Sequence, residues 1–130
     1  MILIDTSALF ALLNAEEPNH ARAAATYRVI GERERLVTHN YVIVETSALV
    51  HRRLGPLAAR DLLERLVPAM ETLWVDRALH ATAVTAFVAA RRRGLSLVDR
   101  VSFQLMRERG IETAFAFDRD FAEEGFSVVP

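Results

Sequence analysis

The chain of 130 residues contains no cysteine and no lysine. Without cysteine, disulfides, zinc–thiolate sites and thiol nucleophiles are excluded. Without lysine, Walker A phosphate loops and Schiff-base chemistry are excluded as well, because both depend on that side chain. The formal net charge is −1, so the chain has no overall positive field and any nucleic-acid binding must rest on local patches of arginine. The lack of cysteine fits a reducing cytoplasm, where we expect the protein to be located.

Long apolar runs are also missing. No uncharged stretch reaches the roughly 18 to 20 residues that a membrane span requires. The N-terminus has no basic start, and Asp5 interrupts the apolar run after Ile4, so we predict no signal peptide. There is no linker, repeat or low-complexity segment, and an apolar share of 52% argues against disorder. We therefore predict one folded domain over residues 1–130.

Histidine offers no metal-ligand spacing such as HxxxH. We interpret the four histidines as ordinary helix and loop residues: His20, His39, His51 and His80.

Short apolar runs alternate with longer helical patterns along the chain. Strands are predicted over residues 2–4, 36–39, 72–75, 113–117 and 126–129. Helices are predicted over 7–13, 18–33, 40–54, 57–67, 78–93 and 96–109, with Gly55-Pro56, Gly94 and Gly110 as stops. Alternating strands and helices favour a parallel sheet covered on both faces. The predicted fold is an α/β/α sandwich of three layers with a central parallel sheet of about five strands.

Acidic residues follow the predicted strands where a ligand would bind, because open parallel sheets bind ligands beyond the carboxyl ends of their strands. Asp5 directly follows the first strand, and Asp118 and Asp120 follow the run Ala114 to Phe117. Asp99 lies in the first turn of the helix over 96–109, and Glu45 lies about one turn into its own helix. We expect these acids, from four separate segments, to converge at one end of the sheet.

Each aspartate also has a purely structural interpretation. Asp5 could cap the helix that follows it. Asp99 and Ser96 fit a capping box, in which two side chains satisfy the free N–H groups of a helix start. Asp118 and Asp120 could be turn residues. The sequence leaves these alternatives open.

Glu45 has the weakest structural alternative. It lies in the segment YVIVETSALV, residues 41 to 50, which is predicted to be a buried helix where an unpaired carboxylate would be costly. Arg52 and Arg53 are too far along for an i,i+4 pair. The positions three and four residues away are uncharged: Tyr41, Val42, Ala48 and Leu49. We therefore expect Glu45 to face a cation supplied from outside its helix.

Clustered carboxylates without a cation repel one another and raise one another's pKa. Hard divalent cations such as Mg²⁺ take oxygen ligands, and a cation so bound activates water and stabilises a phosphoryl oxyanion. This combination favours phosphodiester hydrolysis. Two carboxylates without metal would suggest a glycosidase, but a single tryptophan offers no aromatic platform for sugars.

The chain resembles the PIN-domain nucleases, and in size and layout the VapC-type toxins of type II toxin–antitoxin systems. The resemblance covers nearly the whole chain. It rests on four segments in this order: ILIDTSALFALL, VTHNYVIVETSALV, LSLVDRVSF and TAFAFDRDF. Carried over by motif, the resemblance implies a set of catalytic metal ligands, namely Asp5, Glu45, Asp99 and Asp118. It further implies that Ser7 supports the first aspartate and that Asp120 is an auxiliary acid.

The family resemblance implies an endoribonuclease that depends on Mg²⁺ or Mn²⁺ and leaves a 5′-phosphate and a 3′-hydroxyl. It also implies a homodimer, an RNA substrate, and a cognate antitoxin whose C-terminal segment lies over the cleft. Arginine grips phosphate bidentately, which suits an RNA role. The candidates for RNA contact are Arg91, Arg92, Arg93, Arg100 and Arg119. For Arg91 to Arg93, a solvated helix end favoured by the helix dipole is an equal alternative.

Two rival functions fit less well. A phosphotransfer receiver domain needs a lysine near its acidic pocket, and the chain has none. A haloacid-dehalogenase-type phosphatase would use DRDFA as its motif, but position 122 is alanine and the motif lies at the C-terminal end. A PIN fold that processes RNA without being a toxin, or that binds without cutting, stays open as an alternative.

Overall fold

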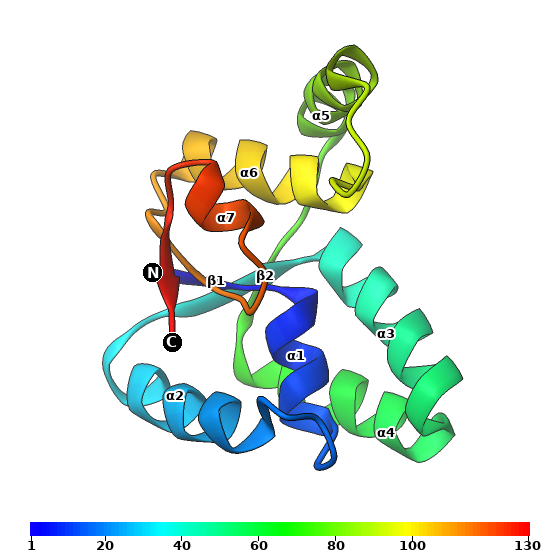
Figure 1. Ribbon diagram of the computed structural model, residues 1–130, viewed down its shortest axis with the longest axis vertical. Coiled ribbons are helices and arrows are strands. Elements are labelled where there is room, and N and C mark those ends of the chain that lie inside the picture. The colour runs from blue at the N-terminus through cyan, green and yellow to red at the C-terminus, as the bar shows by residue number, and fades with distance from the viewer.

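The computed structural model describes all residues, 1–130, and is built around a five-stranded sheet (Figure 1). The strands run parallel in the order β3-β2-β1-β4-β5. They are β1 (Ile2–Ile4), β2 (Leu36–His39), β3 (Glu71–Leu73), β4 (Thr113–Phe115) and β5 (Ser127–Val129). Every residue of β1 and β2 is buried, as the absence of a polar face predicts for central parallel strands.

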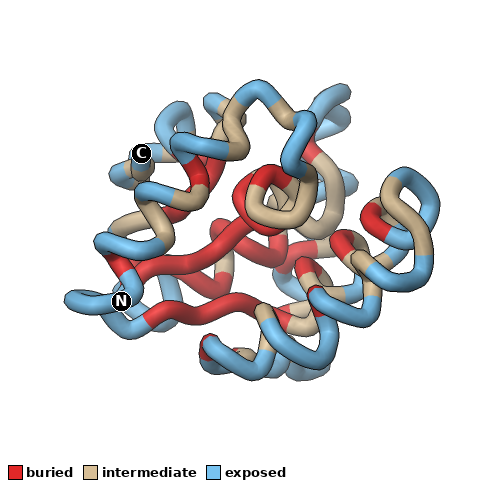
Figure 2. The backbone as a smooth tube through the Cα atoms, turned by 90° about the horizontal axis from the view of Figure 1, so that it is seen from below, coloured by how far each residue is buried: buried red, intermediate tan, exposed pale blue.

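Helices cover both faces of the sheet, which confirms the predicted α/β/α fold. One face carries α1 (Thr6–Leu13), α2 (His20–Arg33), α3 (Asn40–Leu54) and α4 (Pro56–Asp61). The opposite face carries α5 (Arg77–Ala90), α6 (Leu97–Arg109) and the short α7 (Asp120–Glu123). Figure 2 shows the burial that results, with buried strands inside and exposed backbone on the outer sides of the helices. None of the helices combines the length and apolar character needed to cross a membrane.

The order of the strands fixes where a ligand would bind. After β1 the chain adds β2 and then β3 on one side, and later returns to place β4 on the other side of β1. The carboxyl ends of β1 and β4 therefore lie at the topological switch point, where the connections leave in opposite directions and a crevice opens. Asp5 directly follows β1, and Asp118 lies three residues after the end of β4.

Three predicted elements are too long at their C-terminal ends. The strand predicted over 72–75 ends at Leu73. The helix predicted over 78–93 ends at Ala90, and Arg91 adopts the left-handed conformation with φ 46°. Arg91 to Arg93 therefore lie outside the helix. The strand predicted over 113–117 ends at Phe115, because the N–H of Phe117 donates to the Ser7 hydroxyl at 3.0 Å instead of to a neighbouring strand.

The region predicted as one helix over 57–67 is less regular than expected. Helix α4 begins at Pro56, a π-helical stretch follows over Leu62–Leu66, and a 3₁₀ turn covers Val67–Ala69. The short helix α7 was not predicted, because four residues carry too little periodicity to be recognised.

Candidate active site

Asp5 is the most deeply buried acid of the molecule, with 4% of its surface exposed. It is the N-cap of α1, so the structural alternative for this residue is confirmed. Its Oδ2 atom accepts hydrogen bonds from the Ser7 N–H at 3.1 Å and the Ser7 hydroxyl at 2.7 Å. Burial raises the pKa of Asp5 to about 7, and the charges of Asp118 and Asp99 add to this rise against the two bonds from Ser7.

Ser7 joins the two strands at the switch point. Its hydroxyl donates to Asp5 and accepts from the N–H of Phe117, at 3.0 Å. One side chain thus ties the end of β1 to the segment that leads from β4 to Asp118. This arrangement supports the expectation that Ser7 positions the first aspartate.

Glu45 lies in the second turn of α3 and is half-buried. The prediction of a buried helix holds for one face only, because α3 buries Val42, Thr46 and Val50 and exposes Val44. Burial raises the pKa of Glu45, as does the charge of Asp99, although a hydrogen bond from Thr6 opposes the rise.

Thr6 is a contributor that the sequence did not reveal. Its hydroxyl donates to Glu45 Oε2 at 3.0 Å, and the Thr46 hydroxyl donates in turn to Thr6 Oγ1 at 3.0 Å. The only signal was its position between Asp5 and Ser7, in the first turn of α1. Thr6 holds Glu45 beside the switch point without neutralising its charge.

Asp99 forms the predicted capping box at the start of α6. Its Oδ2 atom accepts from the Ser96 N–H at 2.8 Å and the Ser96 hydroxyl at 3.1 Å, and the Asp99 N–H donates back to Ser96 Oγ at 3.1 Å. All of these bonds to the carboxylate use one oxygen. The cap therefore leaves Oδ1 available for another partner.

Asp118 and Asp120 lie on the loop after β4 and at the start of α7. Asp118 Oδ1 accepts the N–H of Asp120 at 3.2 Å, as the turn alternative predicts for Asp118, whereas Asp120 begins α7. Burial raises the pKa of Asp118, and the charges of Asp120, Asp99 and Glu45 raise it further. Burial also raises the pKa of Asp120, with Asp99 and Glu123 adding to the rise and Arg92 opposing it.

The four predicted ligands share one pattern. Each carboxylate uses a single oxygen for hydrogen bonds inside the protein and keeps the other oxygen unpaired, as seen for Asp5, Glu45, Asp99 and Asp118. None of the four takes part in an ion pair. The charge of Asp99 raises the pKa of Asp5, Glu45 and Asp118, and no basic side chain lowers the pKa of these three acids. Such a group of acids lacks a counter-ion.

The donor set fits a hard divalent cation in its chemistry and charge. No three acidic or histidine side chains lie close enough together to enclose an ion directly. A cation that keeps several waters and touches only one or two carboxylates does not need that closeness, and Mg²⁺ binds in this way. The carboxylates therefore fit a hard divalent cation in their chemistry, whereas their spacing does not enclose one.

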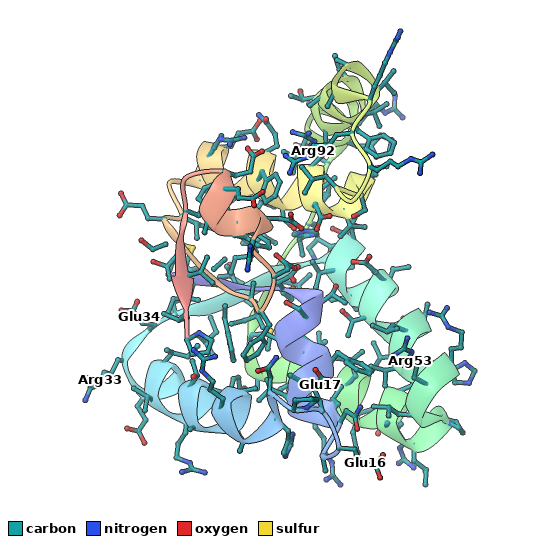
Figure 3. The ribbon with its side chains drawn as sticks, viewed as in Figure 1. Glu16, Glu17, Arg33, Glu34, Arg53 and Arg92 are labelled. Atoms are coloured by element: carbon teal, nitrogen blue, oxygen red, sulfur yellow. The ribbon has the colours of Figure 1, made fainter.

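The candidate arginines differ in their exposure and in whether they form ion pairs. Arg91, Arg93 and Arg119 are exposed, while Arg92 pairs with Glu123 at 3.2 Å beside α6 (Figure 3). Arg100 does not fit the expected RNA contact. Its side chain is 16% exposed, its Nη1 atom lies 3.9 Å from Glu124, and its Nε atom is buried without a partner.

His39 has a structural role that we did not expect from the sequence. It ends β2, is fully buried, and caps α3 by accepting the Val42 N–H at Nδ1, at 3.3 Å. Because Nδ1 accepts, Nε2 carries the proton and donates to Ser102 Oγ at 2.8 Å. Burial lowers the pKa of His39 to about 4, so the ring is neutral at physiological pH.

The largest surface hollow is not at the acids. It measures about 670 Å³ and lies where β2 and β3 begin, between Tyr27, Arg35 and Glu71. A smaller hollow of about 360 Å³ is lined partly by Glu45. The acids, not the size of the hollow, identify the chemical site. Burial raises the pKa of Tyr27 in the large hollow, but no other group of that hollow shifts with it, whereas the pKa values of Asp5, Glu45 and Asp118 are raised together.

Comparison with known proteins gives a consistent result. The family model described as "PIN domain" matches residues 2–126. The chain is 36% identical to the "23S rRNA-specific endonuclease VapC20" of Mycobacterium tuberculosis over 127 residues, which is 97% of this chain and 95% of that protein. The crystal structure of VapC20, described as a "Sarcin-Ricin loop cleaving toxin", matches with a TM-score of 0.90 and 35% identity, covering 100% of both chains.

Two more distant structures share the fold. FitAcB from Neisseria gonorrhoeae matches with a TM-score of 0.70 and 18% identity, over 100% of this chain and 97% of that one. PAE2754 from Pyrobaculum aerophilum matches with a TM-score of 0.66 and 24% identity, over 98% of this chain and 88% of that one.

Proposed function

The chain belongs to the PIN-domain family, and on that basis we propose that it is an endoribonuclease and the toxin of a VapC-type toxin–antitoxin pair. Residues 1–130 form a single nuclease domain in this proposal. The observation that supports it is that the charges of Asp99, Asp118 and Glu45 raise the pKa of other acids of the set, and that each of the four acids keeps one oxygen without a hydrogen bond and takes part in no ion pair.

We propose that Asp5, Glu45, Asp99 and Asp118 hold Mg²⁺ or Mn²⁺, with Asp120 as an auxiliary acid. A divalent cation at this place would lower the pKa of water and stabilise charge on the phosphoryl oxygens. The protein contributes orientation, because Ser7, Thr6 and Ser96 each fix one oxygen of their carboxylate. It also contributes a partly desolvated setting, which strengthens charge interactions within the site.

The substrate that we propose is an RNA loop of the kind named for the relative. VapC20 is described as specific for 23S rRNA and as cleaving the sarcin–ricin loop. The exposed Arg91, Arg93 and Arg119 are suited to phosphate contacts, whereas Arg92 and Arg100 would first have to leave Glu123 and Glu124. An RNA-processing nuclease that is not a toxin is the alternative, and an antitoxin reading frame beside the gene would argue against it.

We also propose a homodimer and an antitoxin partner. Helix α5 is uncharged from Ala81 to Ala90 and exposes Phe87 and Val88 near its C-terminal end. The helix projects beyond α6 (Figure 1). Exposed apolar surface of this kind marks protein interfaces. A second copy on α5 would leave the acidic site open to RNA or to an antitoxin segment.

The experiment that tests the function is cleavage of a synthetic sarcin–ricin stem-loop by the purified chain. We expect one main cut with Mg²⁺ or Mn²⁺, leaving a 5′-phosphate and a 3′-hydroxyl, and no cut in EDTA. An RNA that stays intact in both metals, at protein in excess over RNA, would contradict the proposal.

A further inference from the structure

The hollow of about 360 Å³ beside the acids lies between the start of α3 and the start of α6. Its lining consists of Asn40, Tyr41, Val44, Glu45 and Val98. Glu45 belongs to both the hollow and the acidic site, and Val98 directly precedes Asp99. A group bound in the hollow is therefore adjacent to whatever the acids hold.

The Tyr41 ring is held in place before any ligand arrives. Its hydroxyl contacts His80 Nδ1, and its ring makes edge contacts with the rings of His39 and His80, at 6.2 Å and 5.7 Å between centroids. Val44 is 67% exposed and has no partner that covers it. The hollow thus offers a fixed aromatic ring and exposed apolar surface at little entropic cost.

The polar groups of the hollow exclude a phosphate. No basic side chain lines it, and Glu45 is coupled to the charge of Asp99. Asn40 uses its Oδ1 atom to accept the Val75 N–H at 2.7 Å, and its NH₂ group makes no hydrogen bond within the protein. A suitable ligand is therefore neutral and flat, with apolar faces and an acceptor at its edge.

An RNA base has these properties, and a base outside a helix can stack on an aromatic side chain. We propose that the hollow binds one unpaired nucleobase of the RNA, next to the phosphate that is cut, and so determines where in a loop the enzyme cleaves. This inference rests on the proposed ribonuclease function and adds the group that selects the site of cleavage.

The test uses a fluorescent sarcin–ricin stem-loop whose loop nucleotides are replaced one at a time by an abasic ribonucleotide. For the wild type, we expect one abasic position beside the cut to lower kcat/KM about tenfold, because one base loses its stacking partner. In Val44→Glu, which places a charge in the hollow, cleavage of intact RNA should fall. In this variant, the abasic substitution should lower kcat/KM by less than a further twofold, because the charge in the hollow already excludes the base.

Val29→Glu is the matched control, because Val29 is an exposed valine on α2, away from the hollow. It should keep the full abasic effect. Tyr41→Phe, which keeps the ring, should also keep it, whereas Tyr41→Ala should not. Thermal unfolding of each variant identifies any change that acts through the fold.

Binding of the same RNAs in EDTA, measured by fluorescence anisotropy, gives a readout that does not depend on cleavage. The abasic position should weaken binding by the wild type but not by Val44→Glu. Cleavage with no abasic effect, or an abasic effect of equal size in wild type and Val44→Glu, would overturn the base pocket and leave the ribonuclease function standing. RNA that is bound with the expected abasic effect but never cut would contradict the ribonuclease function instead.

Discussion

Asp99 and Ser96 close a capping box in which every hydrogen bond to the Asp99 side chain goes to Oδ2, so that Oδ1 has no partner in the protein. In the sequence alone, the cap and the metal ligand are alternative roles for this residue. The geometry makes them compatible, because one oxygen serves the helix and the other is available to the site. The same division holds for Asp5, whose Oδ2 serves Ser7 and the start of α1.

The two roles of Asp99 can be separated by a pair of variants. Ser96→Ala removes the cap and should lower the free energy of unfolding by about 1 kcal/mol, but it should keep the stabilisation that Mn²⁺ gives the wild type. Asp99→Asn can still accept a bond from the Ser96 N–H and relieves repulsion among the acids. It should therefore cost less stability in EDTA than Ser96→Ala, yet lose the Mn²⁺ response. Thermal unfolding with and without Mn²⁺ measures both effects, and an intact response in Asp99→Asn would remove Asp99 from the site.

The two acids of DRDF should differ in importance. Asp118 acts on Asp5 and is acted on by Glu45 and Asp99, so it belongs to the centre of the cluster. The pKa of Asp120 is influenced by Asp99 but also by Glu123 and Arg92, on the outer side of the site. We expect Asp118→Asn to reduce kcat on RNA by at least about tenfold more than Asp120→Asn does. The reverse order would mean that Asp120 is the fourth ligand.

The buried Asp5 should make the metal-free protein less stable as pH rises. Its pKa is about 7 in the folded state and its ordinary value is 3.8, so between these values the folded state holds the extra proton. The free energy of unfolding therefore falls as pH rises from about 4 to about 7. Asp5→Asn should remove this dependence.

His39 has the opposite effect on the free energy of unfolding over part of the same pH range. Its pKa is about 4 in the folded state and ordinarily 6.5, so the unfolded state holds the extra proton and stability rises with pH. The difference between wild type and Asp5→Asn isolates the aspartate, because both proteins keep His39. Urea unfolding in EDTA from pH 4.5 to 7.5 measures it, and a difference that does not change with pH would show that Asp5 is ionised throughout.

If the dimer forms through α5, a charge placed on the exposed end of this helix should weaken dimerisation. Val88→Asp places a carboxylate on a residue that is 64% exposed, so the monomer should fold normally while a dimer through α5 weakens. Val29→Asp on α2 is the control and should not change association. Sedimentation at tens of micromolar should show a dimer for wild type and Val29→Asp, and a monomer for Val88→Asp. Equal sedimentation of all three would locate the interface elsewhere or exclude it.

Much of the fold was predictable because its signals are local. Ile2 to Ile4 have no polar face, Gly110 adopts φ 65° where α6 ends, and Ser96 caps the same helix. The end of β4 was not predictable in this way. It depends on the bond from Phe117 to the Ser7 hydroxyl, between residues that are 110 positions apart in the chain.

The same limit applies to the site. Asp5 and Asp118 could be placed at one end of the sheet because parallel strands align their carboxyl ends. The contact from Thr6 to Glu45 and the burial of His39 against Ser102 join separate elements, and no spacing in the sequence encodes them. The low exposure of Arg100 was not predictable for the same reason, since it is decided by the packing of α6 beside Glu124.

The most direct measurement of the central claim is the initial rate of RNA cleavage as a function of Mn²⁺ concentration, for wild type and for Asp5→Asn. Each reaction is matched by a blank that contains EDTA. Val29→Asp, purified in the same way, controls for differences between protein preparations. We expect the wild-type rate to rise from zero to a plateau with Mn²⁺ and to vanish in EDTA, while Asp5→Asn stays at least about a hundredfold slower at every concentration. Cleavage that persists in EDTA, with Asp5→Asn as fast as the wild type, would contradict a metal-dependent nuclease built on these acids.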